Sequence, residues 1–158
     1  MKVQGNLIIF STDNEERKDV RRLKEKKLQV VLDENNTFPT FEVKSKEYIK
    51  NSAENKIENI FKTKKFYIEQ LYTWGDPSYY TDKYELTVSY LVIINKHNIN
   101  EMPKNLKFYD IEIENKEGLT SQNVTLSNEN KKIQYEIDTI VKQNRDNIEY
   151  INKLFKEI

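Results

Sequence analysis

Residues 66–76, FYIEQLYTWGD, constrain the fold more than any other stretch of the chain. The run is apolar and suited to a strand, and it ends at a turn marked by Gly, Asp and Pro at positions 75–77. Upstream, residues 48–61 place apolar side chains at helical spacing, so one face of a helix can pack on a sheet. Downstream, residues 84–94 predict a long strand. A helix with one apolar face, set among strands, indicates an α/β fold.

The charges of the chain balance, with 26 Lys and Arg against 26 Asp and Glu and a formal net charge of zero. There is consequently no overall field to attract nucleic acid, a membrane or an acidic substrate. The one basic run, residues 17–27, contains Asp19 and Glu25, which favours a solvated surface over a nucleic-acid patch. We expect no direct nucleic-acid or membrane partner.

The 158 residues suffice for one hydrophobic core, and we expect a single domain over residues 1–158. The chain has no cysteine, which excludes disulfides and thiolate chemistry and fits a reducing compartment. No run of 18 apolar residues occurs, and the first ten residues are too short and polar for a signal peptide, so a cytoplasmic location is expected. With one histidine and no cysteine, no zinc site is expected.

The remaining pattern predicts further strands and a second helix. Expected strands cover residues 5–10, 28–32, 106–114, 123–127 and 132–138, the last three in a meander, and residues 11–27 form a charged connector. Residues 145–158 predict a second amphipathic helix. Because both helices need a sheet to cover their apolar faces, the expected architecture is an α/β/α sandwich with a mixed sheet between them.

This order of elements, with EQLYTWGD after the helix, resembles the Nudix hydrolase superfamily. Within it, the chain is similar to the ADP-ribose pyrophosphatase-like branch, shared with Nudix-related transcription regulators, where an LEQLYTFGD segment precedes an arginine-bearing loop. Residues 38–43, FPTFEV, fall where that family has L-P-G-G-F-V, and Glu47 falls on the first glutamate of the Nudix box. The resemblance covers residues 5–94 and implies a Nudix-type sandwich. A winged-helix domain often follows in that branch, and we expect it to be absent here.

The family motif G-x5-E-x7-R-E-U-x-E-E-x-G-U supplies carboxylates for magnesium, which prefers oxygen ligands. Laid on this chain, its defined positions hold Phe41, Glu47, Asn55, Lys56, Ile57, Asn59, Ile60 and Lys62. Lys56 brings a positive charge where a cation should bind, and Ile60 has no ligand atom. We therefore expect Glu47, Lys56, Asn59 and Ile60 to be vestigial positions, with no catalytic residue and no metal site.

A shift of register by one position would instead recruit Glu54 and Glu58, which share a helix face at i,i+4 spacing. The same shift would move Ile57 off the apolar stripe. A solvated surface pair is the interpretation that the pattern favours.

The loop after Asp76 has also lost the charged residues that the resemblance implies. Its arginine positions hold Tyr79, Asp82 and Tyr84, so bidentate clamping of phosphate is lost. The candidate ligand-binding residues that remain are Trp74, Asp76, Tyr79, Tyr80 and Tyr84. Their aromatic rings suit stacking on a nucleobase or packing at a sheet edge or dimer seam. This loop and the resemblance together predict a homodimer.

Three functions follow from this comparison. The first is a Nudix-fold domain that has lost hydrolase activity and acts, without a cofactor, as a ligand-sensing, regulatory or dimerisation module for a nucleotide-type small molecule. The second is an active Nudix hydrolase that cleaves a nucleoside diphosphate derivative such as ADP-ribose with Mg²⁺, using carboxylates recruited from Glu42, Glu47, Glu54 and Glu58. The third is the effector domain of a Nudix-related transcription regulator.

Overall fold

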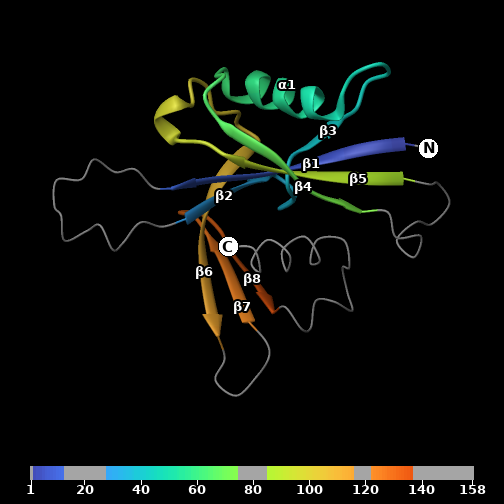
Figure 1. Ribbon diagram of the computed structural model, residues 1–158. Helices are drawn as coiled ribbons and strands as arrows, with labels where there is room; N and C mark the ends of the chain where they lie inside the picture. The colour runs from blue at the N-terminus through green and yellow to red at the C-terminus, as the bar shows by residue number, and fades with distance from the viewer. Residues whose placement is uncertain (1, 13–27, 75–84, 116–121, 137–158) are drawn as a thin grey trace. The chain divides into compact units, whose positions relative to one another are not determined.

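The computed structural model describes residues 2–12, 28–74, 85–115 and 122–136 (Figure 1). The chain divides into two compact units, Met1–Phe108 and Tyr109–Ile158. A single domain over residues 1–158 stays a prediction, because two compact units can belong to one domain. Within the described ranges, no helix has the length and hydropathy needed to cross a membrane.

The first unit is built around β1 (Lys2–Thr12), the strand with the most neighbours in the sheet. On one side β1 pairs in parallel with β5 (Glu85–Ile93), which pairs antiparallel with β4 (Tyr67–Trp74). On its other side β1 pairs antiparallel with β2 (Leu28–Asp33) through residues 10–12 and with β3 (Thr40–Glu42) through residues 4–6. The sheet is therefore mixed, as predicted.

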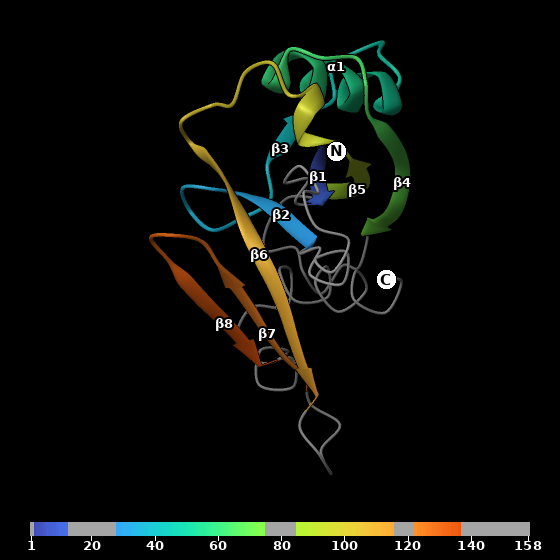
Figure 2. The ribbon, with the colours of Figure 1, turned by 90° about the vertical axis from the view of Figure 1, so that its left-hand side faces the viewer.

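Helix α1 (Ile49–Phe61) lies over one face of this sheet (Figures 1 and 2). It ends at Lys62, which adopts the left-handed conformation with φ of 54°. The loop after β5, which contains a short 3₁₀ helix at Lys96–Asn98, holds this end in place. The backbone N–H groups of Asn100 and Glu101 donate to the Phe61 carbonyl, which satisfies a carbonyl that has no partner inside the helix.

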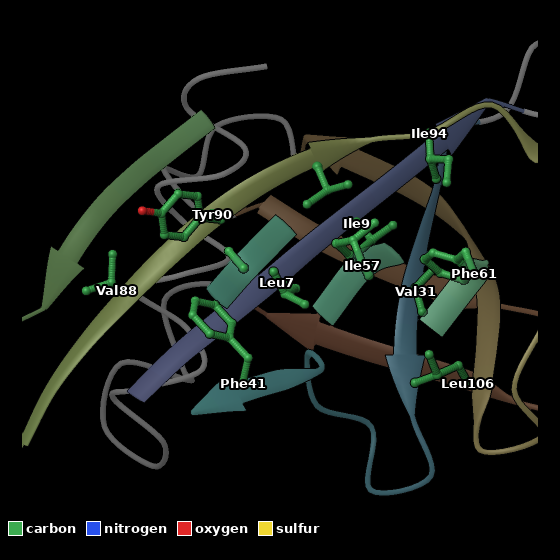
Figure 3. Packing of buried hydrophobic residues seen from close by; sticks show 12 residues of the cluster. Leu7, Ile9, Val31, Phe41, Ile57, Phe61, Val88, Tyr90, Ile94 and Leu106 are labelled. Atoms are coloured by element: carbon green, nitrogen blue, oxygen red, sulfur yellow. The ribbon is translucent and has the colours of Figure 1, made fainter. Parts of the chain in front are cut away.

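The apolar stripe of α1 packs on residues from β1, β2, β3 and β5 (Figure 3). The buried residues of this cluster are Leu7, Ile9, Val31, Phe41, Ala53, Ile57, Phe61, Val88, Tyr90, Val92, Ile94 and Leu106. Each large apolar side chain removed from water contributes roughly 1.5–3 kcal/mol, so this cluster is the main source of stability in the unit. The predicted stripe of α1 is confirmed.

On the opposite face of the sheet, the part formed by β1 and β2 is also shielded from solvent. Ile8, Phe10, Val30 and Leu32 alternate with the residues beneath α1 and are buried as well. The predicted second helix, residues 145–158, lies outside the described residues. The structure therefore shows a mixed sheet with one helix, and the second layer of the sandwich stays a prediction.

Three strands form an antiparallel meander, as predicted: β6 (Leu106–Asn115), β7 (Gln122–Ser127) and β8 (Lys132–Glu136) (Figure 2). β6 begins in the first unit and continues into the second. The turn between β7 and β8 is closed by Asn128, whose Oδ1 accepts hydrogen bonds from the backbone N–H groups of Asn130 and Lys131. Asparagine favours such turns because its side chain bonds to the following backbone.

The sequence pattern did not predict β3. Three residues are too few to show an alternating pattern, and Pro39 stands directly before them. The strand forms because β1 presents backbone groups to it: the Leu7 N–H donates to the Pro39 carbonyl at 2.8 Å, and Gly5 lies opposite Phe41 in the ladder.

Gly5 and Phe41 form a size-matched pair. A Cβ atom on Gly5 would overlap Cε1 and Cζ of the Phe41 ring. That ring is buried and meets Tyr90 edge to face, with centroids 6.0 Å apart. Glycine at position 5 therefore makes room for phenylalanine at position 41.

We predict that Gly5→Ala destabilises the protein by about 1–3 kcal/mol, because overpacking outweighs the roughly 0.5–1 kcal/mol by which alanine is otherwise better than glycine in a strand. Phe41→Ala alone should cost about 3–5 kcal/mol. In the Phe41→Ala background, Gly5→Ala should be neutral or stabilising. Urea unfolding of the four proteins measures the coupling, and an equal cost of Gly5→Ala in both backgrounds would contradict the packing described.

Candidate functional site

Glu47 lies in the turn that leads into α1 and is fixed to the helix by a hydrogen bond. Its backbone N–H donates to the Lys44 carbonyl, and the preceding Lys46 adopts a left-handed conformation with φ of 67°. The Asn55 side-chain amide donates to Glu47 Oε1 at 2.9 Å. The Glu47 carboxylate therefore accepts a hydrogen bond from Asn55, the residue that stands at the arginine position of the motif.

The other three vestigial positions follow on the next turns of α1. Lys56 and Asn59 are exposed, whereas Ile60 is half-buried and packs against the core cluster. This part of the helix thus offers one ammonium, one amide and one apolar side chain that contributes to stability. Their spacing of three and four residues makes them neighbours on the helix surface.

Another flank of α1 carries Glu54, which lies toward the sheet residue Tyr90. Burial of the Tyr90 ring and the negative charge of Glu54 both raise the pKa of the Tyr90 hydroxyl above its ordinary value. Glu54 also lies 3.7 Å from the Lys50 ammonium, an exposed pair of small energetic worth. Opposite Tyr90 on β4, Gln70 donates from its side-chain amide to Thr73 Oγ1. In the sequence, Tyr90 alternates with Val88, a pattern that predicts a core residue and does not predict the nearby charge of Glu54.

Comparison with known proteins identifies the architecture. A scan of protein-family models finds no match, and a search of curated proteins finds no significant one. Among solved structures, the chain is similar to a MutT/nudix family protein from Enterococcus faecalis, with a TM-score of 0.69 and 20% identity over 99% of this chain. The chain has the Nudix fold. A mutT/nudix family protein from Listeria innocua is similar at a TM-score of 0.59 and 8% identity, covering 99% of this chain and 92% of that one.

Two further Nudix-fold structures come from NrtR of Shewanella oneidensis. Its NUDIX domain, crystallised with ADP ribose, matches at a TM-score of 0.52 and 13% identity, covering 99% of this chain and 88% of that one. An NrtR crystal structure with a 27mer DNA matches at a TM-score of 0.55 and 13% identity, covering 96% of this chain. The chain spans 61% of the Enterococcus protein and 59% of the DNA-bound NrtR chain. At these identities the likeness establishes the fold alone.

The Nudix fold implies magnesium, and the donor atoms present here do not fit that ion. Mg²⁺ requires several oxygen ligands in near-octahedral geometry. Across the described ranges, which include Glu42, Glu47, Glu54 and Glu58, no three acidic or histidine side chains are placed to hold a metal together. Glu47 is bonded to Asn55 and Glu54 pairs with Lys50. The described residues therefore do not bring together the carboxylates that the hydrolase alternative needs.

Most of the predicted aromatic ligand site lies outside the described residues. Trp74 is the last residue of β4, where it lies opposite Thr87 of β5. Asp76, Tyr79, Tyr80 and Tyr84 belong to residues 75–84, of which the structure gives no description. Their role in binding a ligand stays a prediction.

Proposed function

We propose that this chain is a Nudix-fold domain without pyrophosphohydrolase activity, which binds a nucleotide-type ligand in a sensing or regulatory role in the cytoplasm. The observation that carries the proposal is the set of side chains at the motif positions of α1. A hydrolase of this fold needs a cation to neutralise the diphosphate and to activate water. Here those positions hold Glu47, which accepts a hydrogen bond from Asn55, the Lys56 ammonium, the Asn59 amide, and the half-buried Ile60, which packs against the core cluster.

The core explains how the catalytic residues can be absent without loss of the fold. Ala53, Ile57 and Phe61 keep the contacts that hold α1 on the sheet, and none of them is a metal ligand. A Nudix-fold scaffold can therefore keep a binding function after catalysis is lost. The NUDIX domain of NrtR crystallised with ADP ribose supports a nucleotide-type ligand for this scaffold.

The alternative of an effector domain in a transcription regulator has its own support. NrtR, with the same fold, was crystallised with a 27mer DNA, which argues against our expectation that nucleic acid is no partner. The balanced charge of this chain argues for that expectation. Binding of labelled duplex DNA at two salt concentrations tests whether this chain contacts nucleic acid, since phosphate contacts give strongly salt-dependent affinity.

We predict that the pure protein does not cleave ADP-ribose in millimolar Mg²⁺ or Mn²⁺. Release of AMP, followed by chromatography, should equal that of the buffer blank, while an active Nudix hydrolase serves as the positive control. Glu47→Gln should change nothing in this assay. Metal-dependent release that Glu47→Gln abolishes would overturn the proposal and restore the hydrolase alternative.

We also propose a homodimer. The aromatic loop that suggested it lies outside the described residues, but β4 and β5 offer further apolar surface. Tyr67 and Ile93 lie directly opposite each other on the sheet face away from α1, and they are 53% and 49% exposed. β4 also ends the strand order of the described sheet, next to this surface. A second copy of the chain would cover this apolar pair.

Sedimentation equilibrium should show a dimer of the parent protein at high concentration. The double variant Tyr67→Lys/Ile93→Lys should shift it toward monomer, because two buried ammonium groups would face each other across a symmetric contact. Tyr48→Lys, at a residue that is 80% exposed and precedes α1, is the matched control and should leave the dimer intact. A monomeric parent would refute the dimer, and a dimeric double variant would exclude this face as the interface.

A further inference from the structure

Two segments that are distant in the sequence bring lysines to the C-terminal end of α1. Residues 62–66 follow the helix, and residues 95–104 belong to the loop after β5. The Asn100 side-chain amide donates to the Lys62 carbonyl at 2.6 Å, next to the Phe61 carbonyl that accepts from the same loop. Figure 1 shows the 3₁₀ helix of this loop beside the end of α1. All of these residues belong to the first unit.

These 15 residues are strongly basic. One residue in three is a lysine, whereas only about one residue in six of the whole chain is basic, and the single acidic residue among them is Glu101. Four of the five lysines are exposed and the fifth is half-buried. We call this set the lysine patch: Lys62, Lys64, Lys65, Lys96 and Lys104.

Within the described residues, no ion pair neutralises the lysine patch. The Lys96 ammonium instead lies 4.6 Å from the centre of the Phe108 ring, a contact that orients the side chain and leaves its charge in place. The helix dipole favours a cation at Lys62, but this effect falls off within the last turn and gives no reason for five lysines. Like charges close together repel one another, and binding of a polyanion would relieve that repulsion.

The side chains around the lysine patch favour a duplex phosphate backbone over other polyanions. Single-stranded nucleic acid stacks its bases on exposed aromatic rings, but Phe61 is fully buried here and Phe66 and Phe108 are half-buried. Insertion into an anionic membrane needs an apolar face, and the only exposed large apolar residue of these two segments is Met102. Duplex DNA needs neither, because its backbone carries one charge per roughly 1.7 Å and attracts lysines by charge alone.

We propose that the lysine patch binds the phosphate backbone of duplex DNA without sequence specificity. This contact goes beyond the proposed function and does not depend on the nucleotide-type ligand. The zero net charge of the chain does not oppose it, because charges more than about 10 Å away are largely screened and the local field depends on the nearest ones. The sequence gives no sign of this surface, because β4 and β5 separate its two segments and neither segment alone is a long basic run.

The test is fluorescence anisotropy of a labelled duplex of random sequence, titrated with the parent chain at roughly 50 and 200 mM salt. Lys62→Gln/Lys64→Gln/Lys65→Gln should weaken binding roughly 10- to 100-fold at the lower salt and reduce the slope of log affinity against log salt by about 2–3, near 0.9 for each lysine. The same three positions changed to arginine should bind like the parent, since arginine also contacts phosphate. Lys96→Gln should weaken binding about 2- to 10-fold, which tests whether the loop after β5 contributes.

The matched control is Lys44→Gln/Lys46→Gln/Lys50→Gln, which removes three exposed lysines at the N-terminal end of α1 and changes the net charge equally. It should bind nearly like the parent, and circular dichroism should show a retained fold in every variant. Absence of binding by the parent at the lower salt, binding that salt does not weaken, or equal weakening in both glutamine triple variants would overturn the proposal. Binding to phosphatidylserine vesicles but not to DNA would overturn it in favour of a membrane surface.

Discussion

The packing of one helix on one parallel strand pair is the interaction on which the rest of the structure depends. β1 and β5 run in parallel through nine registered pairs from Lys2–Glu85 to Phe10–Ile93, and they present Leu7, Ile9, Val88 and Val92 to α1. A parallel pair needs a crossover connection, and α1 belongs to the chain between these strands. Burial of the apolar stripe of α1 therefore holds this crossover helix on the sheet. β2, β3 and β4 then attach at defined registers to either side of this pair.

Under the proposed loss of hydrolase activity, the fold persists because the side of α1 that contacts the sheet is separate from the side that bears Lys56 and Asn59. The side of α1 that contacts the sheet is retained, and the motif positions have been filled by residues that serve packing or local bonding. Phe41 stands at the first glycine of the motif, where its ring fills the space above Gly5. Ile60 stands at a glutamate and packs on the core, and Asn55 stands at the arginine and bonds to Glu47. Phe41 and Ile60 add apolar packing at positions where the motif has a glycine and a glutamate. Lys56 is different, because it is exposed and contributes nothing to the core.

Periodicity was enough to predict α1, most of the strands and the meander, since each has a burial pattern that its own residues display. Tyr48 directly precedes α1 and Ile57 is fully buried, which confirms the helix expected from residue 48 onward and the place of Ile57 on its apolar stripe. The register of the motif positions stays a prediction. The sequence did not reveal β3, whose three residues are placed by the backbone of β1. It gave no signal for the buried hydroxyl of Ser52 or for the Glu47–Asn55 bond, which joins residues eight positions apart across a turn. Such features depend on contacts between residues that the local sequence pattern does not encode.

The central claim is that charge placement on α1 has removed the metal site, and manganese titration followed by electron paramagnetic resonance tests it most directly. For the parent chain, the signal of free Mn²⁺ should match that of buffer up to millimolar concentration, because one hydrogen-bonded glutamate beside a lysine does not hold a hard cation. The variant Lys56→Glu/Asn59→Glu/Ile60→Glu places three carboxylates beside Glu47 and should bind Mn²⁺ measurably, provided that circular dichroism shows a retained fold. Saturable binding by the parent that Glu47→Gln removes, or equal binding by the parent and the triple variant, would contradict the account.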